Sequence, residues 1–359
     1  MIIDPRTREL KSHIQEIIDA GRQVLHEAIK PELHQSVVEI GTGICRDVAQ
    51  ARAEMTAKRR DLAQLAISRG LRIGAAGTHP ISRWEDQTIT ENLRYKQVVE
   101  DMQMVARANL IFGLHVHVGI ENRQTAIEVM NEARYFIPHL LALSTNSPFW
   151  QRRRTGLKSY RLKVFDKFPR TGIPEYFSSY GEFERFVDLL VRTNSIDDGK
   201  KIWWDIRPHP HFDTLEFRVC DIPMRIDETI AIAALIQAIV AKIWALRERN
   251  FGFRLYRRDL LMENKWRASR YGIQGKLIDF GREIEVPFAE LVDELLEFVD
   301  DVLDELGSRS EVGYIRDIMR HGSGADRQLA VFDQTENYEA VVDYIITETH
   351  HGLGLLLGS

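Results

Sequence analysis

The sequence has almost no cysteine and no long uninterrupted apolar run. Its 359 residues include only Cys45 and Cys220, which excludes a disulfide scaffold and a zinc cluster with several cysteine ligands. The longest apolar segment, residues 230–243, is shorter than the roughly 18–20 residues that span a bilayer, so we interpret it as a buried core helix. The start, MIIDPRTREL, is charged and unlike a signal peptide. We therefore expect a cytoplasmic protein.

Charge of one sign and glycine-rich nucleotide motifs are also missing. A net charge of −5 lacks the basic excess that favours nucleic acid or a membrane surface. No GxGxxG follows a strand-like run and no Walker motif is present, which disfavours the Rossmann and P-loop folds. The amino-acid composition is that of an ordinary globular protein, with 44% hydrophobic and 28% charged residues. No linker divides the chain, so we expect one domain over residues 1–352 and a disordered tail over 353–359.

Helical and strand-like segments are mixed without a repeating strand–helix–strand order, which predicts an α+β fold with an antiparallel sheet. Basic segments at 151–161 and 265–270 are expected as loops, and 322–328 as a mobile loop near a site. The predicted strands cover residues 36–40, 71–76, 110–120, 203–207 and 214–220. The predicted helices cover residues 7–30, 46–69, 91–108, 125–144, 183–193, 227–247, 288–306 and 338–349.

Two predicted strands carry charged or imidazole side chains on one face. Side chains two apart on a strand share a face, so Glu216 and Arg218 in TLEFRVC lie opposite the apolar positions. In GLHVHVG the same rule groups His115 and His117. A surface ion pair and a pair of hydrogen-bonded core histidines are the simpler interpretations. The same residues could also hold a metal ion and a phosphate.

Two further strands add a carboxylate and a guanidinium. Glu39 ends the run SVVE, where a solvated face and a metal ligand are equally good interpretations. Arg207 shares a face with Asp205, and His209 and His211 follow in a predicted turn. Carboxylates suit Mg²⁺ or Mn²⁺, which bridge phosphate oxygens, and arginines suit a transferring phosphoryl group. The four strands together predict ATP-dependent chemistry without a P-loop.

Arginines outside these strands are further candidates for binding phosphate or a substrate carboxylate. Arg161 closes the basic segment 151–161, of which 152–154 are expected to be solvated. Arg267 and Arg270 lie among aromatic residues in the segment 265–270.

Six ordered strings resemble the glutamate–cysteine ligase type 2 family over about residues 2–350: QSVVEIGTG, GLHVHVGI, STNSPFW, TLEFRVCDIP, ENKWRASRYG and GSGADRQL. The resemblance implies a glutamine-synthetase-like catalytic fold, a curved antiparallel sheet flanked by helices. It implies that ATP and Mg²⁺ (or Mn²⁺) activate a carboxylate, the γ-carboxylate of glutamate in the type reaction, as an acyl phosphate. An amine, that of cysteine in the type reaction, then displaces phosphate.

The resemblance also assigns roles to residues. Glu39, His115 and Glu216 become metal ligands, with His117 beside them. Arg218 becomes catalytic at the transferring phosphate, and Arg207 is a second catalytic candidate. Arg161, Arg267 and Arg270 remain candidates for binding the nucleotide.

One departure from the family leaves alternatives open. The family carries an acidic strand, Gly-x-Glu-Glu-Glu, just upstream of a segment like IIDPRTREL, and this sequence begins at Met1 within that segment. Either the start is assigned too late or the strand is lost, in which case the chain is a catalytically impaired nucleotide- or metabolite-binding protein. A metal-dependent hydrolase is a third hypothesis, because HxH also marks amidohydrolase barrels, there on the first strand. We expect amino-acid substrates and neither nucleic acid nor membrane as partner, and a homodimer stays open.

Overall fold

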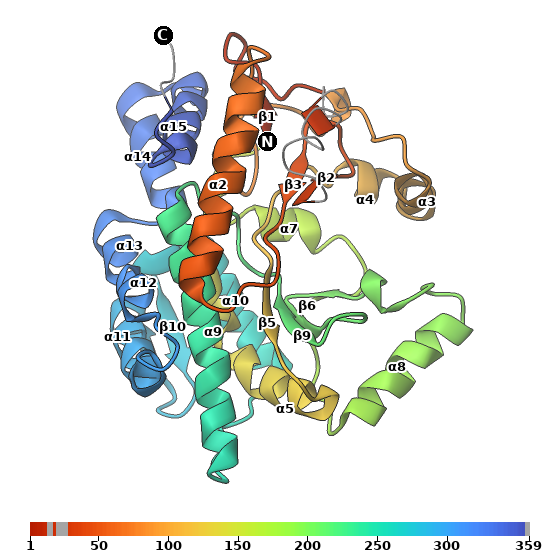
Figure 1. Ribbon diagram of the computed structural model, residues 1–359, viewed down its shortest axis with the longest axis vertical. Coiled ribbons are helices and arrows are strands. Elements are labelled where there is room, and N and C mark those ends of the chain that lie inside the picture. The colour runs from red at the N-terminus through yellow and green to blue at the C-terminus, as the bar shows by residue number, and fades with distance from the viewer. Residues whose placement is uncertain (13–16, 19–27, 356–359) are drawn as a thin grey trace.

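Long helices surround short strands in the computed structural model, which describes residues 1–12, 17–18 and 28–355 (Figure 1). The strands are β1 Ile2–Ile3, β2 Ile29–Pro31, β3 Val38–Ile40, β4 Arg72–Ile73, β5 Val116–Gly119, β6 Thr171–Gly172, β7 Trp203–Trp204, β8 Ile206–Pro208, β9 Thr214–Phe217, β10 Lys276–Asp279 and β11 Ile284–Pro287. The α-helices are α2 Val48–Ile67, α3 Leu93–Met102, α4 Met104–Arg107, α5 Arg123–Ala133, α6 Ile137–Ser144, α7 Arg161–Phe165, α8 Tyr180–Arg192, α9 Ile226–Glu248, α10 Arg258–Tyr271, α11 Phe288–Val299, α12 Arg309–Gly313, α13 Ile315–His321, α14 Gly324–Thr335 and α15 Tyr338–His350. Short 3₁₀ turns include η4, Gly199–Lys201. The expected α+β class is confirmed.

A three-stranded antiparallel sheet, ordered β5–β9–β8, carries the segments with paired polar residues. Its register sets His117 opposite Glu216 and Glu216 opposite Arg207. The other described strands form two-stranded pairs, of which β2–β3 is an antiparallel hairpin and β6–β7 is parallel. The expected curved sheet is therefore divided into a central sheet and separate short pairs.

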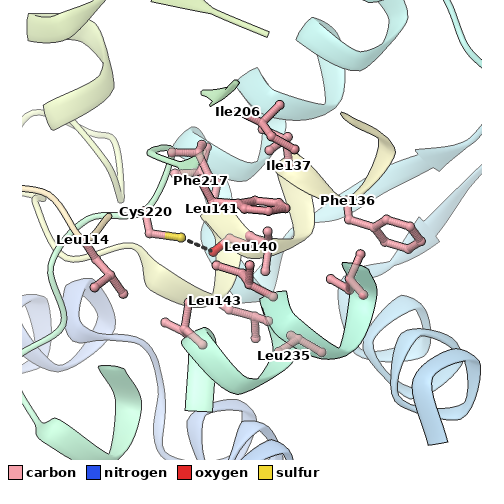
Figure 2. Packing of buried hydrophobic residues seen from close by; sticks show 14 of the residues in the cluster. Leu114, Phe136, Ile137, Leu140, Leu141, Leu143, Ile206, Phe217, Cys220 and Leu235 are labelled. Carbon is pink, nitrogen blue, oxygen red and sulfur yellow. Dashed lines mark hydrogen bonds between the residues drawn. The ribbon is translucent and has the colours of Figure 1, made fainter. Parts of the chain in front are cut away.

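The apolar back of the central sheet packs against α6 and α9 (Figure 2). Leu114, Ile206 and Phe217 from the sheet segments meet Leu140 of α6 and Leu235 of α9, and all five are buried. Among the described residues, α9 alone is long and apolar enough to cross a membrane by length and composition, but 61% of its most apolar window is buried inside the protein. It is the buried core helix that the sequence predicts.

Two segments that the sequence predicts as loops are helical. The segment 265–270 lies inside α10, which no glycine or proline interrupts and which ends before Gly272, in the left-handed region at φ +58°. The segment 322–328 contains the start of α14. There Ser323 and Asp326 cap each other's backbone N–H groups, a capping box that fixes the helix start.

Other boundaries differ locally from the predictions. The predicted helix over 91–108 breaks at Gln103, whose φ of +51° separates α3 from α4. In the predicted helix over 7–30, Leu10 instead bridges Ile3 and Ile29 opens β2, while residues 13–16 and 19–27 lie outside the described residues.

The chain end is also better ordered than the sequence predicts. Leu353 is 1% exposed, and its carbonyl accepts a hydrogen bond from Arg60 Nε at 3.0 Å. These contacts explain why the start of the predicted disordered tail is fixed against the core. Residues 356–359 lie outside the described residues.

Candidate active site

Glu216 lies on the central strand of the three-stranded sheet, and arginines hold both of its carboxylate oxygens. Arg207 Nε donates to Oε2 at 2.7 Å, and Arg218 Nη1 pairs with Oε1. Only 3% of the Glu216 side chain is exposed. Burial alone would raise the pKa of Glu216, but Arg218 and then Arg207 outweigh burial and hold this pKa well below its usual range. The carboxylate is therefore ionised.

His115 and His117 face the same carboxylate from the β5 side, as the two-residue period predicts. His115 Nδ1 lies 3.9 Å and His117 Nε2 3.8 Å from Glu216 Oε1. About a third of each side chain, 32% and 35%, stays exposed, so the imidazoles form the open side of this cluster. Burial is the largest cause that lowers the pKa of both histidines, and the Arg218 charge adds to it. At neutral pH both rings are uncharged, the form in which imidazole binds a metal.

The β2–β3 hairpin and the residue that follows β2 bring two further carboxylates together. Lys30 is opposite Glu39 in this hairpin, and Glu32 follows two residues after Lys30, on the same face. Burial, followed by the charge of Glu39, raises the pKa of Glu32 to about 7, and Arg218 partly opposes this rise. The Glu39 charge also opposes the lowering of the pKa of His117.

The sequence singles out Glu39 as a candidate metal ligand and does not single out Glu32. The string PELHQSVVE contains both glutamates, but nothing in it shows that the strand ending at Pro31, just before Glu32, pairs with the strand that holds Glu39. Once the hairpin pairing is known, the strand period places Glu32 beside Glu39. The hairpin register is therefore the signal that would have identified it.

The donor chemistry fits a hard divalent cation, although the ligands are not gathered around one point. Among the described residues, no three His, Cys, Asp or Glu side chains are close enough to hold a metal ion. The repulsion between Glu32 and Glu39 is a cost that a bound cation would relieve. Carboxylate oxygens are the ligands that Mg²⁺ and Mn²⁺ prefer, and Glu32, Glu39 and Glu216 would supply them.

Backbone carbonyls occupy two of the arginines predicted for the site. Arg207 Nη1 donates to the carbonyl of Lys200 in η4 at 2.9 Å. Arg161 is buried and donates to the carbonyls of Arg218 and Val219, both at 3.1 Å. A Cβ at Gly113 would lie 2.3 Å from Arg161 Nη2, so this glycine makes room for a guanidinium of the protein itself. Both arginines brace the strands that present Glu216 and Arg218.

A buried ion pair lies behind Arg218. Lys265 Nζ of α10 lies 2.7 Å from Asp205 Oδ2, and the Asp205 carbonyl accepts the Arg218 N–H at 2.8 Å. Asp205 lies at a bend between β7 and β8, so strand parity does not hold there and its carboxylate pairs with α10. The predicted site residues do not include Lys265, because its pairing with Asp205 is a contact between segments that lie far apart in the sequence.

The two remaining candidates lie on α10 with other partners. Arg267 pairs with Glu263 at 2.9 Å and with Glu285 of β11 at 2.6 Å. The guanidinium of Arg270 lies over the Tyr271 ring, 4.9 Å from its centroid. Among the described residues, the structure records no ion pair that joins either arginine to the Glu216 cluster. Their role in nucleotide binding stays a prediction.

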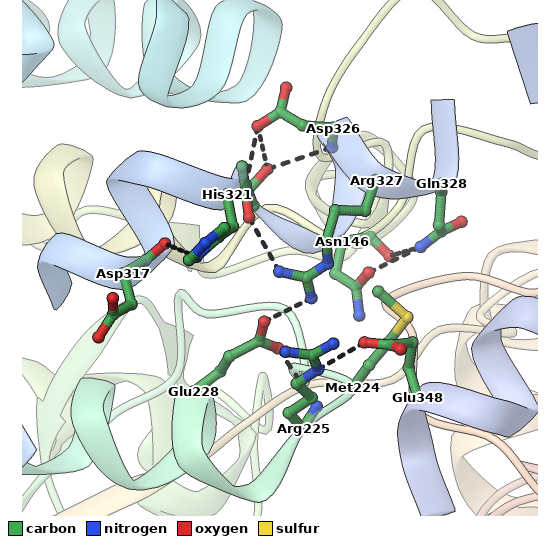
Figure 3. Close-up of polar contacts among 12 residues, drawn as sticks. Asn146, Met224, Arg225, Glu228, Asp317, His321, Asp326, Arg327, Gln328 and Glu348 are labelled. Atoms are coloured by element: carbon green, nitrogen blue, oxygen red, sulfur yellow. Dashed lines mark hydrogen bonds and ion pairs between the residues drawn. The ribbon is translucent and has the colours of Figure 1, made fainter. Parts of the chain in front are cut away.

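A buried polar network joins the strings STNSPFW and GSGADRQL (Figure 3). The Asn146 side chain accepts a hydrogen bond from Gln328 of α14 at 2.7 Å and donates to the carbonyl of Ile222 at 2.8 Å. The Asn146 backbone N–H donates to Asp221, which also lies 3.9 Å from Arg161. Burial raises the pKa of Asp221, and Arg161 opposes the rise. The network therefore reaches from α14 to the arginine that braces β9.

The helices around this network are tied by ion pairs. Arg327 of α14 pairs with Glu228 of α9, and Arg225 Nε lies 2.5 Å from Glu348 Oε2 of α15 (Figure 3). Lys158 Nζ lies 2.5 Å from Asp326 Oδ1. These contacts fix α14 and α15 against α9 and the segment that follows α6.

Comparison with known proteins decides the family. The Glutamate-cysteine ligase family 2 matches residues 1–344. The chain belongs to this family. Proteins named "Putative glutamate--cysteine ligase 2" are 60% identical in Solibacter usitatus, over 98% of this chain and 91% of the relative, and 57% identical in Roseiflexus castenholzii, over 99% and 94%. The expectation of a ligase-family enzyme, made from the residues and the resemblance, is confirmed at this level.

Solved structures share the fold at low sequence identity. The glutamate–cysteine ligase of Francisella tularensis in complex with AMP has a TM-score of 0.69 at 13% identity, and the match covers 98% of this chain and 88% of that one. A bifunctional glutathione synthetase from Pasteurella multocida has a TM-score of 0.63 at 12% identity, over 92% of this chain and 48% of that one. Together with the described elements, these matches confirm the predicted fold class.

Proposed function

We propose that this protein uses ATP to join a carboxylate to an amine, with glutamate as the carboxylate substrate and cysteine as the amine. The observation that carries the proposal is the clamp on Glu216: an ionised, buried carboxylate between Arg207 and Arg218, with two neutral imidazoles within 4 Å on the open side. This arrangement presents arginine, carboxylate and imidazole side by side, and arginines and a carboxylate-bound cation are groups that stabilise charge on a transferring phosphoryl group.

The proposed reaction has two steps. An oxygen of the substrate carboxylate attacks the γ-phosphorus of ATP, and the bond between this phosphorus and the β–γ bridging oxygen breaks. The products of this step are ADP and an acyl phosphate. The amine nitrogen then attacks the acyl carbon, phosphate departs, and the nitrogen loses a proton to give the amide. The two substrates supply the two nucleophiles, a carboxylate oxygen and an amine nitrogen, so no protein nucleophile is needed.

Each protein group has a definite task in this scheme. Among the described residues Arg218 Nε has no hydrogen-bond partner, and we assign it to an oxygen of the transferring phosphoryl group. Glu216 orients Arg218 through Nη1, and Arg207 in turn fixes Glu216. Glu32, Glu39 and Glu216, with His115 and His117, would hold a divalent cation, which when bound neutralises phosphate charge.

Two comparisons support the proposal. The two relatives described above carry glutamate–cysteine ligase in their names, at 57–60% identity over nearly the whole chain. The structural neighbour from Francisella tularensis was solved with AMP, which supports an adenine nucleotide as ligand. We also propose a reducing compartment such as the cytoplasm, which suits the two free cysteines.

The test is ADP release from ATP and Mg²⁺ in the presence of glutamate and a panel of amines that includes cysteine. The proposal expects release that depends on both the carboxylate and the amine. Hydrolysis of a substrate in a reaction without ATP would support the metal-dependent hydrolase instead. ATP binding with no turnover on any pair would support the impaired binding protein and overturn the ligase.

A further inference from the structure

The turn between β8 and β9 carries an exposed aromatic side chain beside the Glu216 cluster. Phe212 is 60% exposed, although it lies only four residues before Glu216 in the sequence. Its ring stacks on His209, with centroids 4.5 Å apart and ring planes 11° from parallel. His117 meets both rings edge-on, 5.3 Å from His209 and 6.4 Å from Phe212. We call His117, His209 and Phe212 the aromatic ledge.

The turn that presents the ledge is held at several points. His209 Nδ1 accepts the backbone N–H groups of His211 at 3.2 Å and Phe212 at 3.0 Å. Arg123, the first residue of α5, donates to the His209 carbonyl at 2.6 Å and pairs with Asp213 at 3.1 Å. A ligand that stacks on this ledge would therefore not have to order it first, which lowers the entropic cost of binding.

The ledge adjoins the charged cluster directly. His117 belongs to both, because its ring meets the ledge while its Nε2 lies 3.8 Å from Glu216 Oε1. Thr214 closes the turn two strand residues before Glu216, a rise of about 7 Å. A ligand with a flat ring on the ledge could thus place an anionic chain along β9 towards Arg218.

We propose that the aromatic ledge binds the adenine ring of ATP, with the exposed face of Phe212 as the stacking surface. This inference rests on the proposed function, and it adds a base-binding residue that the charged cluster does not contain. Aromatic faces stack on nucleobases through their π surfaces. A free amino acid such as glutamate or cysteine has no flat ring to use this surface, so among the proposed substrates the nucleotide is the one that fits.

The experiment compares Phe212→Ala with wild type and with Phe251→Ala, a control at another phenylalanine that is also 60% exposed. ADP binding is measured by calorimetry, and KM is measured for ATP, UTP, glutamate and cysteine. The ledge predicts roughly 5- to 100-fold weaker ADP binding and a similar rise in KM for ATP in Phe212→Ala, from the loss of one base stack. It also predicts that Phe212→Ala prefers ATP over UTP less than wild type does. ADP binding and the KM for ATP should stay near wild type in Phe212→Tyr and should not change in Phe251→Ala.

The outcomes separate the ledge from the function on which it rests. If wild type binds ADP and Phe212→Ala binds it equally well, the ledge is overturned and the proposed function stands. If Phe212→Ala raises KM for an amino acid and leaves that for ATP unchanged, the ledge belongs to the other substrate and the proposal is wrong. If wild type binds no adenine nucleotide, both proposals fail.

Discussion

Arg207 Nε donates to Glu216 Oε2 at 2.7 Å across neighbouring strands β8 and β9. The other end of the Arg207 guanidinium is held by the carbonyl of Lys200, so this arginine is fixed at both ends. Its charge stabilises ionised Glu216 before any ligand arrives. Among the described residues Arg218 Nε has no hydrogen-bond partner, and we assign this atom to the substrate. Arg207 is therefore a positioning residue in this account, and Arg218 is the catalytic one.

Replacing the clamped carboxylate should damage activity and stability together. Glu216→Gln leaves Arg207 and Arg218 buried without their counter-charge, so we expect about 3–5 kcal/mol less stability in urea unfolding. ADP release should fall about 100-fold or more, because Arg218 is no longer oriented electrostatically. The control is Glu263→Gln, which breaks a partly exposed pair with Arg267 and should change stability by less than about 1 kcal/mol. Equal effects of the two variants would contradict the clamp.

The Glu32–Glu39 pair should set the response to Mg²⁺. Glu32→Gln removes a proposed cation ligand, and with it the repulsion from Glu39 that a bound cation would relieve. The variant should therefore need roughly 10- to 100-fold more Mg²⁺ for half-maximal ADP release. A Mg²⁺ titration of initial rates measures this, with Glu263→Gln again as the control. An unchanged Mg²⁺ requirement would show that the hairpin does not contribute to the cation site.

His139 should make the fold sensitive to acid. Burial among Tyr135, Phe136 and Phe288 lowers the pKa of His139 to about 4. In the unfolded chain His139 takes up its proton near pH 6.5. The contribution of neutral His139 to the free energy of unfolding is therefore complete above that pH, and about 3 kcal/mol of it is lost as the pH falls to about 4. His139→Phe should flatten the dependence of unfolding free energy on pH by this amount. The exposed control His321→Gln should keep the wild-type slope, and a parallel curve for His139→Phe would refute the assignment.

The contact between α14 and Asn146 should not tolerate a methyl group. A Cβ at Gly324 would lie 2.1 Å from Asn146 Oδ1, whose position is fixed by Gln328 and Ile222. Gly324→Ala should therefore cost about 1–3 kcal/mol in urea unfolding. At Gly313, by contrast, no atom of the described residues lies within 4 Å of the added Cβ, so Gly313→Ala should be neutral or stabilising by up to about 1 kcal/mol. Similar losses in both variants would mean that the Asn146 network does not hold α14.

The two-residue strand period was enough to group His115 with His117 and Glu216 with Arg218. That period is a local property of extended backbone, and the ion pairs around Glu216 show that it held where the strands are regular. It failed at Asp205, where the chain bends and the carboxylate turns to Lys265. A bend of one residue changes the face and leaves no mark in composition.

What the sequence could not supply was pairing between distant segments. Glu32 joins Glu39 because β2 and β3 form a hairpin, and Arg161 is occupied because Gly113 admits it from another segment. Both facts depend on tertiary contacts. The start of α14 is different, since Ser323 and Asp326 carry a capping pattern that can be recognised in the sequence, but the surrounding glycines favoured a loop.

The most direct test of the proposed function follows oxygen atoms. Glutamate labelled with oxygen-18 in its γ-carboxylate is incubated with the protein, ATP, Mg²⁺ and cysteine, and the phosphate released is analysed by mass spectrometry. Attack of the carboxylate on the γ-phosphorus, followed by displacement by the amine, transfers one labelled oxygen to each phosphate. We expect labelled phosphate whose formation requires cysteine. Unlabelled phosphate would mean that water attacks ATP, and that result would contradict the acyl phosphate and the ligase.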